Sequence, residues 1–84
     1  MRRFFIHLEV GGALQSDGVG ILCEAPELAY LQACRAIPDV AAEMLRHRQD
    51  PMDCRFVIEN EKGEEMFVVP FDEVIREQPH KLPG

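Results

Sequence analysis

The chain has 84 residues, 46% of them hydrophobic and 29% charged, which is enough apolar material for one small folded domain. Fifteen acidic residues against nine basic ones give a formal net charge of −6 at pH 7. This charge repels phosphate groups, so the composition argues against direct binding of nucleic acid. No stretch approaches the roughly 20 apolar residues that a membrane-spanning helix needs, so we expect no membrane partner.

The first predicted strand covers Arg3–Val10, where apolar residues alternate with others. One side of this strand, predicted to face a helix, carries Phe4, Ile6, Leu8 and Val10. Phe5 and His7 belong to the other side. Two clusters of turn residues then predict a long, mobile loop over Gly11–Gly20, followed by a short second strand at Ile21–Cys23.

A helical region is predicted to begin at Pro26, a residue that suits the first turn of a helix. Pro38 lacks the N–H that would bond to the carbonyl of Cys34, so we expect a kinked helix or two helices, at 26–36 and 38–48. The apolar stripe that we expect to face the core is spaced by threes and fours. It consists of Leu28, Leu31, Cys34 or Arg35, Ile37, Val40, Ala41, Met44 and Leu45.

A second hairpin is predicted from strands at Cys54–Asn60 and Met66–Val69, joined by a polar turn that contains Gly63. Pro70 ends the second of these strands, and Asp72 is expected to cap a short final helix. We therefore predict a single α+β domain over residues 1–77 and a frayed tail over residues 78–84.

The predicted architecture is a four-stranded antiparallel sheet in the order β-β-α-β-β, with the proline-kinked helix on one face and a short C-terminal helical turn. The other face would carry Phe5 and Val57, together with either Met66 and Val68 or Phe67 and Val69. Such a face is more apolar than a solvated one usually is, so we expect a partner to cover it, most simply a second copy. The interface candidates are Phe5, His7, Val57 and Val68.

Three cysteines, Cys23, Cys34 and Cys54, show no C-x-x-C spacing and predict reduced thiols in a cytoplasmic protein. The apolar run Phe4–Ile6, which follows Arg2 and Arg3, is cut short by His7 and Glu9, which argues against a signal peptide.

Several segments, taken in their order and spacing, resemble a family of small alphaproteobacterial proteins described as a domain of unknown function. They are Arg3–Leu8, Asp17–Ile21, Ala33–Ala41, Phe56–Ile58, Gly63 and Pro70–Phe71. The resemblance implies that the proline within the helix belongs to the family pattern, and it implies no activity, ligand or catalytic residue. A weaker similarity, from Asp17-Gly18 to Leu28-Ala29, is to the amino-terminal part of HicB-type antitoxins.

His7, the Asp17 loop and Cys23 form the one candidate pocket, as a nucleophile with its base or as metal ligands. Their spacing matches no known motif, and a hydrogen-bonded structural histidine is the simpler interpretation. A second group of potential ligands, in the turn before the second hairpin, consists of His47, Asp50, Asp53 and Cys54. These are ordinary turn residues, so we predict no catalytic, metal or cofactor site.

These observations favour a non-enzymatic interaction or regulatory module, homodimeric through the sheet face, that binds another protein or a small regulator. One alternative is an antitoxin-like acidic inhibitor of a basic toxin or nuclease. Another is a small enzyme or metal site that uses His7 and Cys23.

Overall fold

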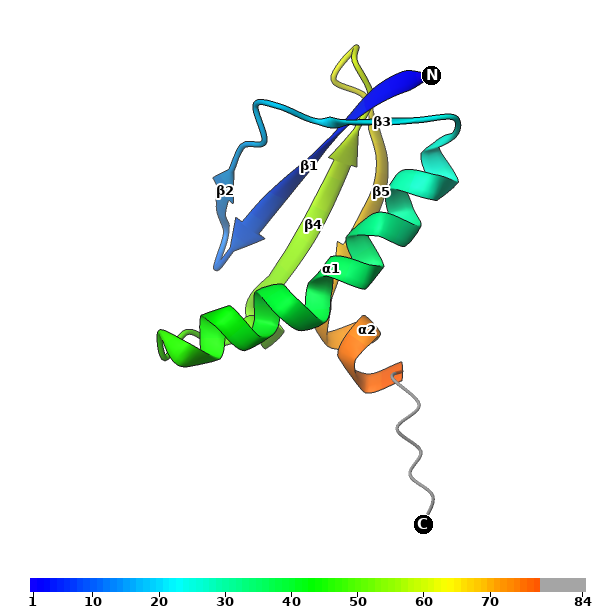
Figure 1. Cartoon of the computed structure of the whole chain (residues 1–84). Helices are drawn as coiled ribbons and strands as arrows, with labels where there is room; N and C mark the ends of the chain where they lie inside the picture. The colour runs from blue at the N-terminus through cyan, green and yellow to red at the C-terminus, as the bar shows by residue number, and fades with distance from the viewer. Residues whose placement is uncertain (78–84) are drawn as a thin grey trace.

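The computed structural model describes residues 1–77, which form an α+β domain with a helix layer on one face of an antiparallel sheet (Figure 1). In chain order the elements are β1 (Arg2–Val10), β2 (Ala13–Gln15), β3 (Ile21–Cys23), α1 (Pro26–Arg46), the 3₁₀ helix η1 (Pro51–Asp53), β4 (Cys54–Glu59), β5 (Glu65–Pro70) and α2 (Phe71–Glu77). The predicted α+β class, with an antiparallel sheet and a helix on it, is confirmed, whereas the predicted order β-β-α-β-β was wrong because three strands precede α1. The predicted frayed tail lies outside the described residues.

The sheet has five strands, so the prediction of four strands was wrong. Its order is β2-β1-β4-β5, and β3 also pairs with β1. The missed strand is β2, which lies within the segment Gly11–Gly20 that we predicted to be a loop. All three residues of β2 are exposed, so no alternation of buried and exposed positions marks it. Its pairing with β1 places Val10 opposite Ala13 and Leu8 opposite Gln15.

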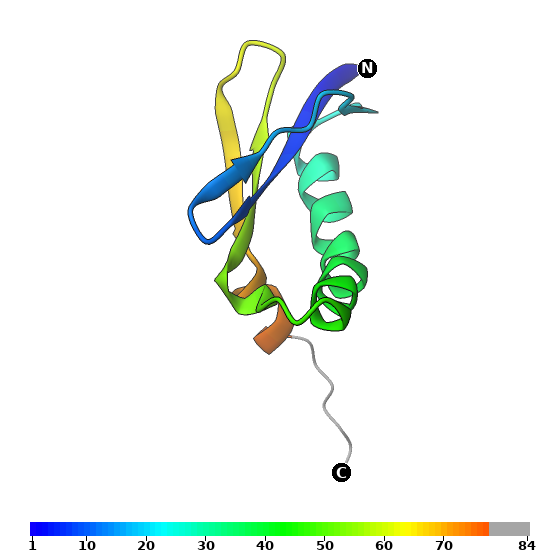
Figure 2. The same cartoon turned by 90° about the vertical axis from the view of Figure 1, so that its left-hand side faces the viewer.

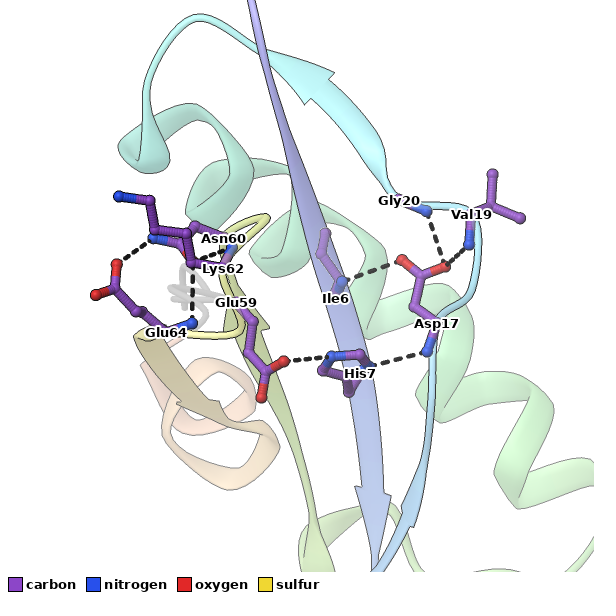
Figure 3. Close-up of polar contacts among 9 residues, drawn as sticks. All are labelled: Ile6, His7, Asp17, Val19, Gly20, Glu59, Asn60, Lys62 and Glu64. Atoms are coloured by element: carbon purple, nitrogen blue, oxygen red, sulfur yellow. Dashed lines mark hydrogen bonds and ion pairs between the residues drawn. The ribbon is translucent and has the colours of Figure 1, made fainter.

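β2 and β3 together form an interrupted strand along one edge of β1. β2 pairs with the end of β1, and β3 pairs with its beginning. Leu8 lies opposite Gln15 and Phe4 opposite Ile21, so four steps along β1 correspond to six steps along the partner. The two additional residues loop out between β2 and β3. Figure 3 shows this loop on the side of β1 away from β4.

The core lies between the sheet and α1, as the view along the layers in Figure 2 shows. The largest fully buried side chains are Phe4, Ile37, Ile58, Val69 and Phe71. From α1 the core receives alanines and other residues three or four positions apart, namely Ala29, Ala33, Ile37, Ala41 and Met44. Small alanine side chains allow the helix to approach the sheet closely.

Three leucines of α1 that we predicted to face the core, Leu28, Leu31 and Leu45, are exposed. That part of the predicted stripe was wrong because the face that packs on the sheet is the alanine face. The size of a leucine side chain was a misleading signal, because smaller alanine side chains occupy the buried face of this helix.

Pro38 lies inside a continuous helix, so the division into helices 26–36 and 38–48 is not found. Proline removes one hydrogen bond of the helix, but Ile37 and Ala41 on either side are both buried and hold the backbone in place. The helix axis changes direction along its length (Figure 1). None of the helices within residues 1–77 has the length and hydrophobicity to cross a membrane.

Candidate functional site

The open face of the sheet, opposite α1, brings the four predicted interface candidates together. His7 of β1 lies opposite Val57 of β4, and Val57 lies opposite Val68 of β5. Residues directly opposite one another in neighbouring strands project on the same face. Phe5 adds its ring next to that of His7, with the ring centroids 6.4 Å apart and the planes nearly parallel.

The register also decides which of the two predicted pairs of β5 residues lies on the open face. Phe67 lies opposite Ile58 and Val69 opposite Phe56, so both belong to the core face, and Val68 belongs to the open face. A register shift at Ile58/Glu59 displaces Met66 from regular pairing.

His7 is 8% exposed although it projects from the open face. Its Nδ1 accepts a hydrogen bond from the backbone N–H of Asp17 at 2.9 Å, and its Nε2 lies 3.0 Å from Oε1 of Glu59 (Figure 3). Because a backbone N–H only donates, Nδ1 carries no proton and Nε2 donates to the glutamate. Both ring nitrogens are therefore occupied within the domain.

Asp17 is the centre of the looped-out segment between β2 and β3. Its Oδ2 accepts from the backbone N–H of Ile6 at 3.1 Å, and its Oδ1 accepts from Val19 at 3.0 Å and Gly20 at 3.1 Å (Figure 3). The carboxylate thus replaces the missing strand pairing in the middle of β1. Burial raises the pKa of Asp17, but the hydrogen bonds from Gly20, Ile6 and Val19 and the nearby His7 bring it below its ordinary value of 3.8.

Gly20 allows this segment to pass close to β1. Its φ is +77°, and a Cβ atom there would lie 2.8 Å from the carbonyl oxygen of Phe4 and 3.0 Å from the ring of Phe5. Any larger residue would push the segment away from the strand. The guanidinium of Arg3 adds a hydrogen bond to the carbonyl of Val19 at 2.8 Å.

Cys23 does not join His7 and Asp17. It is 5% exposed and belongs to the core cluster on the face that α1 covers, whereas His7 projects from the opposite face. The sheet therefore separates the thiol from the imidazole, and the three side chains form no common pocket. All three cysteines are free thiols.

The second predicted group of ligands is also dispersed. His47 pairs with Glu43, and the carboxylate of Asp50 accepts from the backbone N–H of Met52. Burial, and then the nearby carboxylates of Asp53 and Asp50, raise the pKa of the Cys54 thiol. Within residues 1–77, no three His, Cys, Asp or Glu side chains are arranged to hold a metal ion.

Charged pairs border the apolar centre of the open face. Arg55 Nε donates to Glu9 Oε1 at 2.7 Å, and the His7–Glu59 pair lies further along the same two strands. Leu14 and Leu22, which lie opposite Glu9 and Arg3 on the edge strands, are 52% and 55% exposed. The open face thus has an apolar centre, charged pairs beside it and further apolar side chains at its edge.

A second apolar surface, which sequence reasoning missed, is a groove of about 520 Å³ between α1, η1 and α2. Its lining includes Ile37, Pro38, Leu45, Met52, Val74 and Ile75. Residues so distant in the chain are brought together only by the packing of α2 against α1. Glu59 was likewise missed as the partner of His7, since that pairing depends on the register between β1 and β4.

The fold and the open face define a small α+β domain whose distinctive polar feature is a histidine held between a loop and a neighbouring strand. A family model described as a domain of unknown function, DUF6894, matches residues 3–72. The chain belongs to this family. No curated protein and no solved structure shows significant similarity to it.

Proposed function

We propose that the protein is a cytoplasmic, non-enzymatic interaction module that forms a homodimer through the open face of the sheet and presents its remaining surface to a protein partner or a small regulator. The observation that carries this proposal is the continuous row formed by Phe5, His7, Val57 and Val68 across β1, β4 and β5. Both α-helices among residues 1–77 pack on the other side of the sheet.

The composition of this face supports the proposal. An apolar centre bordered by charged pairs is the usual anatomy of a protein interface. Exposed Leu14 and Leu22 extend the apolar area towards the edge of the sheet. A two-fold axis through such a face pairs the same patch with itself, which is the commonest symmetry of soluble oligomers. A domain of this size also has a thin stability margin, which association increases.

Sedimentation velocity of the wild type and of Phe5→Asp tests the proposal. The substitution places a carboxylate in the apolar centre, so we expect the wild-type dimer to dissociate into folded monomers. Leu45→Asp is the matched control, because Leu45 is 63% exposed and lies in the groove on the helix side. It should leave the dimer intact.

The result that contradicts the sheet-face interface is a Phe5→Asp variant that remains dimeric. Loss of the dimer in Leu45→Asp alone would instead move the interface to the groove. Circular dichroism of each variant separates dissociation from unfolding. Val68→Asp repeats the test from a different strand, in case the stacking of Phe5 on His7 is needed for folding.

An antitoxin-like role, the second candidate, is favoured by the acidic tip of the β4–β5 hairpin. Glu59, Glu61, Glu64 and Glu65 lie there within seven residues. Asn60 orders this tip, since its Oδ1 accepts from the backbone N–H groups of Lys62 and Glu64 (Figure 3). A fixed acidic tip suits the basic active site of a nuclease.

The test of this second role is inhibition of a small basic protein encoded by a neighbouring gene. The double variant Glu61→Lys/Glu64→Lys should abolish inhibition while leaving the dimer unchanged. Full inhibition by this variant, or the lack of any such neighbour, would count against the role.

A further inference from the structure

Asp17 holds the segment between β2 and β3 to β1 through two contacts with different chemistry, in addition to the hydrogen bond from Arg3 to the Val19 carbonyl. The carboxylate of Asp17 accepts three backbone hydrogen bonds, whereas its backbone N–H donates to Nδ1 of His7. The first contact requires a charged aspartate and the second requires a neutral histidine. Only the second is sensitive to pH in the range where histidine side chains change charge.

Proton uptake by His7 is incompatible with the observed hydrogen bond. Nδ1 would then carry a proton that points at the Asp17 N–H, so two donors would face each other across 2.9 Å. The imidazole or the segment has to move for both to be accommodated.

The charged groups that surround His7 come from several elements. On β4, Glu59 Oε1 lies 3.0 Å from Nε2, and the carboxylate of Asp17 lies in the segment itself. Further charges on this face are the Glu9–Arg55 pair of β1 and β4, and Arg3, which binds the carbonyl of Val19. On β5, Glu65 lies opposite Glu59 in register.

We propose that His7 and Asp17 form a proton-operated latch: the neutral imidazole accepts from the backbone N–H of Asp17, and the protonated imidazole loses this bond and remains paired with Glu59, while the carboxylate of Asp17 still holds the segment 16–20 to Ile6. The segment lies against the ring of Phe5 at Gly20, so a shift of its backbone at Asp17 alters the surroundings of Phe5 on the open face. The latch concerns the regulation of the proposed interface, but its chemistry and its test do not depend on whether that interface exists.

Amide hydrogen exchange, followed by NMR on the dilute protein from about pH 8 to about pH 5, tests the latch. After correction for intrinsic exchange, the protection of the Asp17 amide should fall about five- to tenfold on acidification, as expected for the loss of one hydrogen bond. Glutamine does not titrate but keeps a side-chain acceptor, so in His7→Gln the protection of the Asp17 amide should not depend on pH. His47→Gln, at an exposed histidine that pairs with Glu43, should respond like the wild type.

Unchanged protection of Asp17 in the wild type would overturn the proposal, and so would an equal fall in His7→Gln. If His7→Gln does not fold, ¹⁵N NMR of the imidazole in the wild type takes its place. The latch requires an Nε2-protonated ring at high pH and loss of the Asp17 contact when Nδ1 is protonated. An Nδ1-protonated neutral ring would exclude it. A monomeric wild type would refute the dimer without affecting any of these outcomes.

Discussion

On the helix-covered face of the sheet, Phe4 and Ile58 are fully buried, whereas one residue further along the same strands Phe5 and Glu59 remain partly exposed on the open face. The covered face is held by apolar packing against α1. The open face is held by directional contacts, in which a histidine and an aspartate complete the edge of β1. Packing therefore sets the stability of the domain, and the polar contacts set the shape of the surface that it offers.

The largest expected effect distinguishes the two faces directly. Phe4→Ala creates a cavity under α1 and should lower the free energy of unfolding by about 3 to 5 kcal/mol, which removes most of the stability of so small a domain. Leu22→Ala, at an exposed site on the open face, should change it by less than about 0.5 kcal/mol. Urea denaturation measures both. Equal losses would show that the two faces are packed alike.

A smaller effect is expected where the looped-out segment passes β1. In Gly20→Ala the new Cβ would lie 2.8 Å from the Phe4 carbonyl oxygen, at a residue with positive φ. The free energy of unfolding should fall by about 2 to 3 kcal/mol. Gly18→Ala is the matched control in the same segment, because its Cβ would meet nothing within 4 Å. Thermal melting that ranks the two variants equally would contradict the described path of the segment.

The smallest of the three effects, and one that depends on pH, is expected for Asp17→Asn. The Asn side chain has an NH₂ group in place of the oxygen that accepts from the Ile6 N–H. Near neutral pH the free energy of unfolding should therefore fall by about 1 to 3 kcal/mol. The pKa of Asp17 is lower in the folded state than in the unfolded state. The contribution of its carboxylate to stability is therefore complete above the pKa of the unfolded state and is lost as the pH falls through the pKa of the folded state.

The stability difference between wild type and Asp17→Asn should therefore shrink below about pH 4, as chemical denaturation at several pH values would reveal. A difference that is constant with pH would contradict the role of the charged carboxylate.

The same contrast explains how far the sequence predicts the structure. Alternation in Arg3–Val10 and Cys54–Asn60 correctly assigned residues to the two faces, because one face of each strand is buried. It missed β2, which buries nothing and is held by backbone pairing alone. Periodicity located α1 but not the alanine face that it buries, since that choice depends on the distance between layers.

Of the candidate site, the structure brings His7 next to the Asp17 segment and into a row with Phe5, Val57 and Val68. Sequence reasoning grouped Cys23 with them although the thiol lies on the other face of the sheet. The pairing of His7 with Glu59 and the groove beside α2 arise from strand register and helix packing. Neither leaves a local pattern in the chain.

In the proposed dimer the open face, and not the helix side, meets a second copy of the chain. Methyl NMR with a soluble paramagnetic probe, recorded from dilute to concentrated protein, tests it most directly. We expect the methyl signals of Val68 to become protected from the probe as the concentration rises, while those of Leu45 stay accessible. Val68 signals that remain accessible at every concentration, or protection of Leu45 in their place, would contradict it.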